Sequence, residues 1–589
     1  MQPSQPNRAE SGRAELSRAA SVRPRPNLAA LKLWAAPVLS AALLELPFPL
    51  AGPLPVWRTI FAWFGLVPLL AVLLAPSSVN SPRPLRLSFL LGYLAGFLWF
   101  MGNCYWVRDT MAKYGDLPAI VPVLLLIGYS AVLGLYWGLF GLGVALVRRA
   151  SGSTRWALAA APVLWAGIEL AASRITSVPW DQLGYSQVDN TLVNHLAPWT
   201  GVYGISFVLV AVNALIAGGL VLDCRQVYRF RQALRFSDRQ ISGVAGAILL
   251  CVGAIGVTIA PQRPAPTATA ILIQPNLDVG GESRWNGPGE WDAHMAQFAQ
   301  WAAETCKPSI AGIPQTGAPT VVPDCAALPA HPDLVAWPES PAPFDESDPR
   351  FQHSLAKIAQ SVQAPIIVGS IGWTLDPSTQ DWNYYNSALV IGADGVRTGR
   401  YDKIHLVPFG EYIPFQNLLT FAHKLTGRVS RFTRGDGPKV FRLASATGDA
   451  HRYGIFICYE AVFADEVRHF AQLGADVLVN ISDDGWYGDT SAPWQHLNMV
   501  RMRAIENRRW ILRSTNNGVT AVIDPYGVVR QSIPRHQAAA LAAQFAFRND
   551  ITFYTAHGDI FGWLCALLGL GIVGWSARKL VRTNAPSVR

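Results

Sequence analysis

The sequence predicts a polytopic α-helical membrane protein of eight spans that carries one α/β domain on a single side of the membrane. Three observations support this fold class. The chain of 589 residues is 51% hydrophobic and only 15% charged, whereas a soluble domain carries about 25% charged residues. Apolar windows long enough to cross a bilayer recur up to residue 260 and once more near the C-terminus. The stretch 261–555 instead alternates short apolar strands with amphipathic helices.

The eight apolar windows are the predicted spans. Glu45 lies in the first window and Glu169 near the end of the fifth, and the other six windows contain no charge. An acid inside a membrane can be functional, but each of these two lies close to a segment end, so we interpret both as interfacial residues. The windows cover approximately residues 33–51, 59–75, 87–107, 120–147, 156–172, 202–222, 241–260 and 560–577.

The distribution of basic residues distinguishes the two sides of the membrane. The loops on one side contain only Arg58, Arg108, Lys113 and Arg174. An excess of Lys and Arg marks cytoplasmic loops, so both termini are predicted to be cytoplasmic and residues 261–555 to lie on the far side. The net charge of +9 comes largely from these predicted cytoplasmic loops and tails, and not from one face of a soluble domain. We therefore do not expect nucleic acid as a partner. The cytoplasmic set comprises Arg8, Arg13, Arg18, Arg23, Arg25, Lys32, Arg83, Arg86, Arg148, Arg149, Arg155, Arg225, Arg229, Arg231, Arg235, Arg239, Arg578, Lys579, Arg582 and Arg589.

These patterns divide the chain into five parts. We predict a disordered basic tail over 1–30, seven transmembrane helices over 31–260, the α/β domain over 261–555, the eighth helix over 556–580 and a cytoplasmic tail over 581–589. The loop 173–201 is predicted to face the same side as the domain. Predicted strands lie at 269–275, 334–337, 365–371, 387–391, 454–458, 476–481, 510–514, 519–523 and 528–533, and predicted helices at 289–305, 350–362, 464–473 and 494–508. This alternation indicates a sandwich whose sheets are buried by helices.

Cys458 ends one of these strands. A strand that stops on a cysteine and continues into a helix presents a thiol at the edge of a sheet, which suits a nucleophile. The alternative is an inert, buried cysteine. His405 and His496 are the histidines nearest to the motifs, and both are interpreted as structural or packing residues.

Two further segments carry groups that such a thiol needs. Glu339 follows a strand and a rigid proline, where partial desolvation raises a carboxylate's pKa into the range of a general base. Lys403 and Glu411 flank an apolar turn, and an ammonium near a thiol can favour thiolate or hold a developing oxyanion. Each segment alone is also typical of an ordinary surface turn. Cys306 and Cys325, which flank an insertion, form either a disulfide or two free thiols.

The motifs Trp-Pro-Glu339-Ser, Lys403-Ile-His-Leu-Val-Pro-Phe-Gly-Glu411 and Ile-Cys458-Tyr-Glu460, in this order, resemble the Glu-Lys-Cys triad of the nitrilase superfamily. The resemblance implies an αββα sandwich. Together with seven spans before the domain and one after it, the motifs resemble the apolipoprotein N-acyltransferase family. Asp483 and Gly485 depart from the family pattern, where Asn and Ala are expected.

The resemblance implies a role for each matching residue. Glu339 would be the general base, Lys403 the cation that stabilises the oxyanion and Cys458 the acyl-accepting nucleophile. The supporting residues would be Glu411, which positions the lysine or the base, Tyr459 and Glu460 beside the nucleophile, and Trp285 near the acyl substrate. No metal or other cofactor is implied.

The implied reaction is acyl transfer from a phospholipid, through a cysteine thioester, to the N-terminal α-amine of a diacylglyceryl-cysteine apolipoprotein. The implied location is the bacterial inner membrane, with the catalytic domain in the periplasm. The sequence leaves the oligomeric state unassigned. One alternative is a membrane-tethered amidase that uses water as the acceptor. Another is a transporter or receptor whose domain only binds a ligand.

Overall fold

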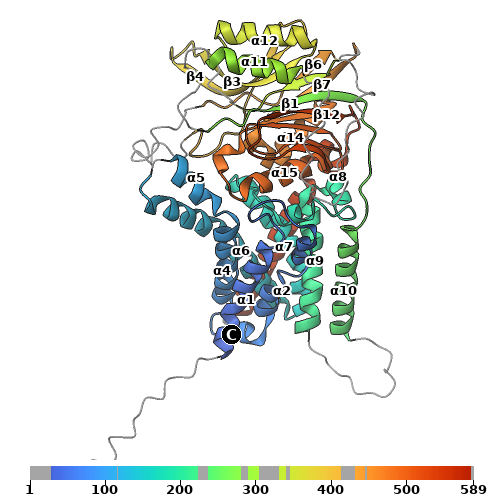
Figure 1. The fold of residues 1–589 in the computed structure, drawn as a ribbon. Coiled ribbons are helices and arrows are strands. Elements are labelled where there is room, and N and C mark those ends of the chain that lie inside the picture. The colour runs from blue at the N-terminus through green and yellow to red at the C-terminus, as the bar shows by residue number, and fades with distance from the viewer. Residues whose placement is uncertain are drawn as a thin grey trace, which may run out of the picture.

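The computed structural model describes residues 28–115, 117–222, 237–279, 290–303, 331–339, 345–412, 432–444 and 448–584. A helical bundle forms one end of the molecule and an α/β sandwich the other, and the C-terminus lies at the end of the bundle that faces away from the sandwich (Figure 1). The bundle contains α1 (Leu28–Glu45), η1 (Val56–Trp63), α2 (Val67–Leu74), α3 (Pro76–Val79), α4 (Pro84–Asn103), α5 (Trp106–Tyr114), α6 (Ile120–Ser151), α7 (Thr154–Ile175), η2 (Leu183–Gln187), η3 (Asn194–Leu196), α8 (Ala197–Thr200), α9 (Val202–Val221), α10 (Asp238–Gly256) and α17 (Ile560–Asn584).

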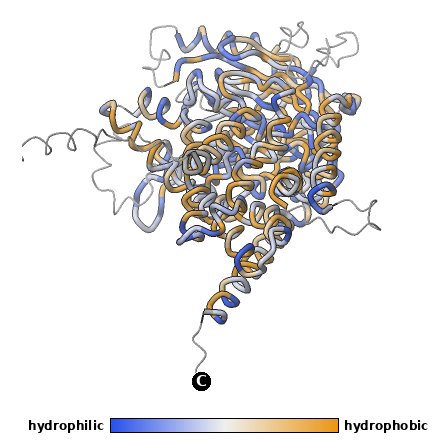
Figure 2. Tube along the Cα trace, turned by 90° about the horizontal axis from the view of Figure 1, so that it is seen from below, coloured by the Kyte–Doolittle hydropathy of each residue, from blue (hydrophilic) through white to orange (hydrophobic). Residues whose placement is uncertain are grey.

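Seven helices among the described residues are long and apolar enough to cross a membrane. The first predicted span is shorter than the sequence suggests, because its apolar helix covers Leu33–Glu45 and ends just before Pro47 and Pro49. The count of eight spans is therefore not confirmed, although the polytopic class is. Seen from the bundle end, hydrophobic residues run along these helices (Figure 2). The seven are Val56–Leu74, Pro84–Asn103, Ile120–Ser151, Thr154–Ile175, Val202–Val221, Asp238–Gly256 and Ile560–Thr583.

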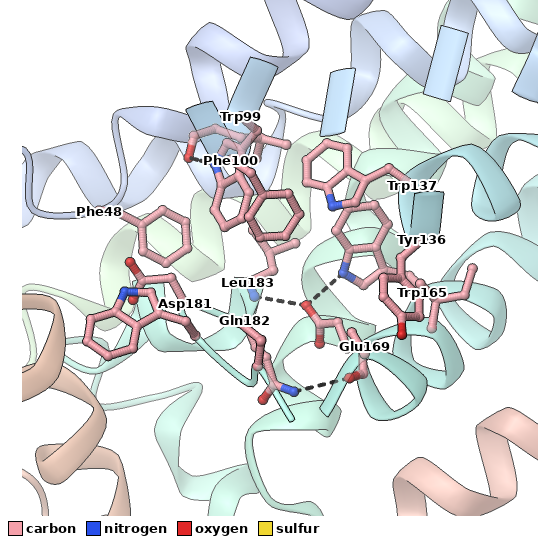
Figure 3. Close-up of a pocket in the computed structure, with 15 residues that line it drawn as sticks. Phe48, Trp99, Phe100, Tyr136, Trp137, Trp165, Glu169, Asp181, Gln182 and Leu183 are labelled. Atoms are coloured by element: carbon pink, nitrogen blue, oxygen red, sulfur yellow. Dashed lines mark hydrogen bonds between the residues drawn. The ribbon is translucent and has the colours of Figure 1, made fainter. Parts of the chain in front are cut away.

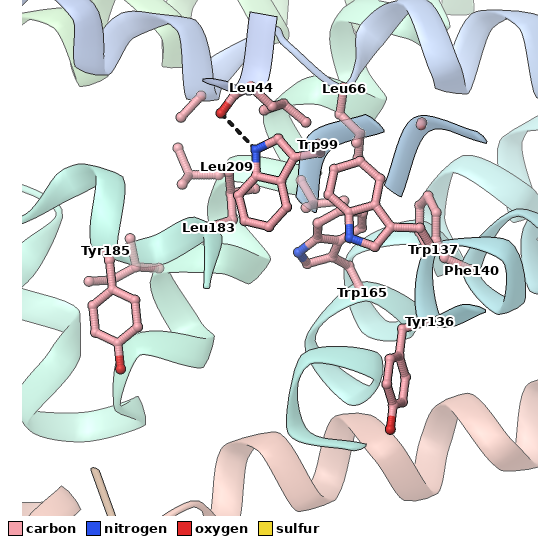
Figure 4. Packing of buried hydrophobic residues seen from close by; sticks show 14 of the residues in the cluster. Leu44, Leu66, Trp99, Tyr136, Trp137, Phe140, Trp165, Leu183, Tyr185 and Leu209 are labelled. Carbon is pink, nitrogen blue, oxygen red and sulfur yellow. Dashed lines mark hydrogen bonds between the residues drawn. The ribbon is translucent and has the colours of Figure 1, made fainter. Parts of the chain in front are cut away.

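Aromatic side chains fill the centre of the bundle (Figure 4). Trp137 of α6 stacks on Trp99 of α4 at 5.6 Å between ring centroids and meets Trp165 of α7 edge-on at 4.8 Å. Helices α4 and α6 approach closely at Gly92, where an added Cβ would lie 2.3 Å from the Trp137 carbonyl oxygen. Small residues of this kind let helix backbones approach closely. In a lipid bilayer, where the hydrophobic effect does not drive helices together, such close packing stabilises their association.

The sandwich contains two six-stranded sheets in the described part of the chain. One sheet has the order β12-β1-β2-β3-β4-β5 and the other β11-β10-β9-β8-β7-β6. The first comprises β1 (Ala268–Gln274), β2 (Leu334–Ala336), β3 (Ile366–Leu375), β4 (Trp382–Ile391), β5 (Arg397–Asp402) and β12 (Ala539–Phe545). The second comprises β6 (Val440–Ala444), β7 (Ala450–Ile457), β8 (Val477–Ser482), β9 (Ile511–Thr515), β10 (Thr520–Ile523) and β11 (Val529–Ile533).

Helices cover both outer faces of the paired sheets, which confirms the αββα architecture. Helices α11 (Glu290–Ala302) and α12 (Pro349–Val362) lie on the far side, whereas α14 (Ala464–Gln472) and α15 (Ala492–Asn507) lie between the sandwich and the bundle (Figure 1). The short helix α16 (Phe553–His557) leads into α17. The central strands β1–β3 and β7–β9 are parallel, and most of their residues are buried because helices and the facing sheet cover both of their faces.

The bundle and the sandwich share one buried core. Tyr459, Met499 and Ile505 of the sandwich belong to the same apolar cluster as Trp63, Leu70 and other bundle residues. A buried ion pair and a buried hydrogen bond also cross this interface, and Arg503 pairs with Glu506 within α15. Arg501 of α15 binds Asp189, and the Nη2 of Arg503 donates to the Tyr185 hydroxyl and to Glu506, each at 3.0 Å.

Arg503 gives a test of this interface. Replacing Arg503 with Met leaves Glu506 buried without its cation, which we expect to lower the free energy of unfolding by about 3–5 kcal/mol. Denaturant titration in detergent measures the change. Arg442→Met, at an exposed position of β6, is the matched control and should change the free energy by less than about 0.5 kcal/mol. If the two variants had equal free energies of unfolding, the expected contribution of the buried Arg503 cation would be contradicted.

Candidate active site

The three groups of the predicted triad each follow a strand of the sandwich. Glu339 comes shortly after β2, Lys403 directly after β5 and Cys458 directly after β7. The first two strands belong to one sheet and the third to the other, so the two sheets bring the residues together from opposite sides. All three side chains are buried, with Lys403 only 1% exposed.

The Lys403 ammonium joins two carboxylates. Its Nζ lies 3.1 Å from Glu339 Oε1 and 2.9 Å from Glu411 Oε1. The other oxygen of Glu339 accepts a hydrogen bond from the backbone N–H of Asp483 at 2.9 Å, and that of Glu411 accepts from Val407 N–H at 2.8 Å. Each carboxylate is thus fixed at both oxygens, which sets the direction in which Glu339 can exchange a proton.

Asn386 on β4 is a member of this cluster that the sequence did not reveal. Its Nδ2 donates to Glu339 Oε1 at 2.7 Å and to Glu411 Oε1 at 2.6 Å, and its backbone oxygen accepts from Lys403 N–H at 2.9 Å. An asparagine in the middle of a strand carries no sequence signal of this kind. Only the pairing of β4 with β5 shows that it lies beside the lysine.

Cys458 occupies a strained turn. Its φ of 47° lies in the left-handed region, which costs a residue other than glycine about 1–3 kcal/mol and is typical of functional sites. The Glu460 carboxylate holds the turn by accepting hydrogen bonds from Ile457 N–H and Ile404 N–H, both at 2.6 Å. It also accepts from the Tyr401 hydroxyl at 2.7 Å. Glu460 therefore ties the segment that carries Lys403 to the turn that carries Cys458.

Burial sets the electrostatics of the site. Burial and the charge of Glu339 raise the pKa of the Cys458 thiol well above its usual value, although Lys403 acts in the opposite direction. Burial alone would lower the pKa of Lys403, but the carboxylates of Glu339 and Glu411 raise it above its usual range. The resting site thus combines a neutral thiol with a charged lysine, and the thiol needs a base in order to react.

Asp483 adds a third carboxyl group beside the base. Burial and the charge of Glu339 raise its pKa well above the usual value. Its side-chain oxygens accept from Gly485 N–H at 3.0 Å and from Asn516 Nδ2 at 3.2 Å. This residue is one of the two departures from the family pattern, and it lies in direct contact with the predicted triad.

The turn that carries Cys458 faces the bundle. Tyr459 stacks on Trp180 of the loop 173–201, with 6.5 Å between ring centroids, so this loop contacts the domain. Trp180 also lines a largely apolar pocket among α1, α4, α6 and α7 (Figure 3). Glu169 lies in the wall of this pocket and accepts hydrogen bonds from Trp165 Nε1 at 2.8 Å and Leu183 N–H at 2.9 Å. Protein groups thus hold this carboxylate in place.

Three residues singled out from the sequence lie outside the described residues: Trp285, Cys306 and Cys325. The two histidines are placed. His405 stacks on Phe463 and its Nδ1 lies 2.9 Å from Glu466, whereas His496 contacts the backbone of Cys458. His496, for which the sequence indicates a packing role, therefore lies directly against the turn that carries Cys458.

Two family models match the chain. The apolipoprotein N-acyltransferase N-terminal domain matches residues 40–215, and the carbon-nitrogen hydrolase domain matches residues 290–545. An apolipoprotein N-acyltransferase of Geobacter metallireducens is 34% identical over 90% of this chain and 92% of its own length. The corresponding protein of Shewanella oneidensis is 30% identical over 88% of this chain and 93% of its own.

Among solved structures, an amidase of the nitrilase superfamily from Nesterenkonia sp. AN1 is similar to this chain. It covers 52% of this chain and 99% of its own, with 14% identity and a TM-score of 0.33.

The charge of Glu339 can be tested through the reactivity of the thiol. Because a neighbouring carboxylate disfavours thiolate, Glu339→Gln should lower the pKa of Cys458 and move its alkylation by iodoacetamide to lower pH by about one unit. Mass spectrometry of the peptide that contains Cys458, over a series of pH values, measures the midpoint. Glu346→Gln removes a carboxylate that pairs with Arg397 and Arg400 instead, and should leave the midpoint unchanged. A midpoint that stays or rises in Glu339→Gln would contradict this arrangement.

Proposed function

The chain belongs to the apolipoprotein N-acyltransferase family, and we propose that it transfers an acyl chain from a phospholipid, through a thioester on Cys458, to the N-terminal α-amine of an apolipoprotein. It is an acyltransferase with a nitrilase-like catalytic domain and several membrane helices. The observation that carries the assignment of residues is the contact of Lys403 with Glu339 beside a buried thiol on a strained turn.

In the first half of the proposed reaction, Glu339 accepts the proton of the Cys458 thiol. The sulfur attacks the ester carbonyl of the phospholipid, and a tetrahedral oxyanion forms. The Lys403 ammonium and the backbone N–H of Tyr459 stabilise the negative charge. The ester C–O bond then breaks, and Glu339 returns its proton to the departing oxygen, so that a lysophospholipid leaves and a thioester remains.

In the second half, the α-amine of the acceptor attacks the thioester carbonyl. Glu339 accepts a proton from the nitrogen, the carbon–sulfur bond breaks, and the thiol regains a proton from Glu339. The same base therefore works in both directions, which requires that it be neither fixed as an acid nor fully exposed to water. Glu411 and Asn386 support this role, because they hold Lys403 and Glu339 at fixed hydrogen-bond distances.

The position of the bundle beside the site favours a lipid as the substrate. Acyl chains are costly to expose to water, at about 0.8 kcal/mol per CH₂ group. The turn that carries Cys458 contacts the bundle through Tyr459 and Trp180, and Trp180 also lines the apolar pocket. A nucleophile for a soluble amide would have no need of this position.

The proposed topology places both termini in the cytoplasm and the catalytic domain in the periplasm of a bacterial inner membrane. The distribution of Lys and Arg supports it. A phosphatase reporter that is active only outside the cytoplasm should be inactive when fused after residue 589. An active fusion would contradict this topology and would show that the C-terminus lies outside the cytoplasm. It would not bear on the proposed chemistry of the site.

The function itself is tested by isolating the acyl-enzyme. Purified protein incubated with phospholipid alone should carry one acyl group on Cys458, visible by mass spectrometry and released by hydroxylamine, with an equal amount of lysophospholipid. Glu339→Gln should reduce the rate about 10²–10⁴-fold, and Cys458→Ala should carry no thioester. Folded wild-type protein without an adduct, or turnover of small amides without phospholipid, would favour an amidase instead.

A further inference from the structure

His496 makes a contact with the nucleophile turn that the proposed triad does not use. Its Nε2 lies 3.0 Å from the backbone carbonyl oxygen of Cys458. A carbonyl oxygen can only accept a hydrogen bond, so Nε2 carries a proton and donates it. The side chain is fully buried, and the contact therefore persists without competition from water.

The peptide unit that accepts this hydrogen bond also contains the backbone N–H of Tyr459. In a trans peptide the carbonyl and the N–H point in opposite directions, and no described peptide bond is cis. A donor fixed on the carbonyl therefore fixes the direction of the N–H on the other side. It also polarises the peptide, which makes that N–H a stronger donor.

The other face of the imidazole is anchored by a buried charge network. Nδ1 lies 3.0 Å from Asp484 Oδ1, which also accepts from the Ser482 hydroxyl at 2.8 Å. Arg513 donates to the second oxygen of Asp484 at 2.5 Å. Burial opposes the charge of Asp484, but Arg513 and His496 outweigh it and hold the pKa of this carboxyl below its usual range. A charged carboxylate thus fixes the ring.

The bundle fixes the helix that carries His496. Trp180 stacks on the imidazole with 6.1 Å between ring centroids, and its Nε1 donates to Gln495 Oε1 at 2.8 Å. Gln495 in turn donates to the backbone oxygen of Asn103 in α4 at 3.0 Å. Two successive residues of α15 are therefore held by groups from the membrane helices and their loops.

We propose that His496 is a positioning residue: it orients and polarises the Cys458–Tyr459 peptide so that the Tyr459 N–H points to the oxyanion. The inference rests on the proposed function, because it requires an oxyanion at Cys458. Both ring nitrogens are engaged, one by the Cys458 carbonyl and one by Asp484, so neither is left to act as the base of the thiol.

A matched pair of substitutions tests this role. Gln and Met have nearly the same length and shape, but only Gln can donate a hydrogen bond from the position of Nε2. Two rates are measured on each purified variant in detergent: formation of the Cys458 thioester from phospholipid, and alkylation of Cys458 by iodoacetamide. Alkylation is a displacement that develops no oxyanion, so it reports the thiol and the fold alone.

His496→Met should slow thioester formation about ten- to a hundredfold, since losing a whole oxyanion donor costs about 10²–10³-fold. Its alkylation rate should stay within about twofold of wild type. His496→Gln should recover most of the lost rate. His496→Asn, whose amide reaches only the position of Nδ1, should behave like Met and provides a second variant without the donor.

Three results would overturn the inference: equal thioester formation in His496→Met and wild type, equal loss in Gln and Met, or a parallel loss of alkylation in Met and Asn. A wild-type protein that forms no thioester would instead refute the proposed function. The two failures are therefore distinguishable in one set of measurements.

Discussion

A single buried ammonium, that of Lys403, is the interaction on which the site depends. It is 1% exposed and holds Glu339 and Glu411 at hydrogen-bond distance. Removing the ammonium would leave two buried carboxylates without their cation in a region with little water, at a cost of several kcal/mol. The strands that carry these residues must therefore keep their register, because Lys403 follows β5 and reaches Glu339 across β3 and β4. The αββα sandwich is the scaffold that makes this reach possible.

A second constraint joins the sandwich to the membrane. The turn at Cys458 packs against Trp180, and the helix behind it is held by Asp189, Tyr185 and Asn103 of the bundle. The apolar core is continuous across this boundary. The two parts of the chain thus form one packed unit. The position of the thiol relative to the helical bundle is fixed by the same contacts that stabilise the fold.

Much of this could be predicted from the sequence, and the failures have physical causes. The spans are long apolar runs and the parallel strands are short segments rich in apolar residues, and most were found near their observed bounds. Three strands were missed: β5 is polar, β6 is a short edge strand, and the alanine-rich β12 resembles a helix. Asn386 and His496 were missed as site residues because their roles come from pairing across sheets and helices, which leaves no local pattern. The first span ends early because two prolines follow Glu45.

The state of the thiol connects these observations to the proposed chemistry. A cysteine whose pKa is raised by burial and by Glu339 is a poor nucleophile at rest, which protects it from alkylation and oxidation. Reaction then requires that the base, the cation and the oxyanion donor act on the same substrate at once. The base and the cation are set by the two sheets, and the donor by the peptide that His496 holds. The membrane helices reach that peptide through Trp180 and α15, so the bundle contributes to the geometry of the site.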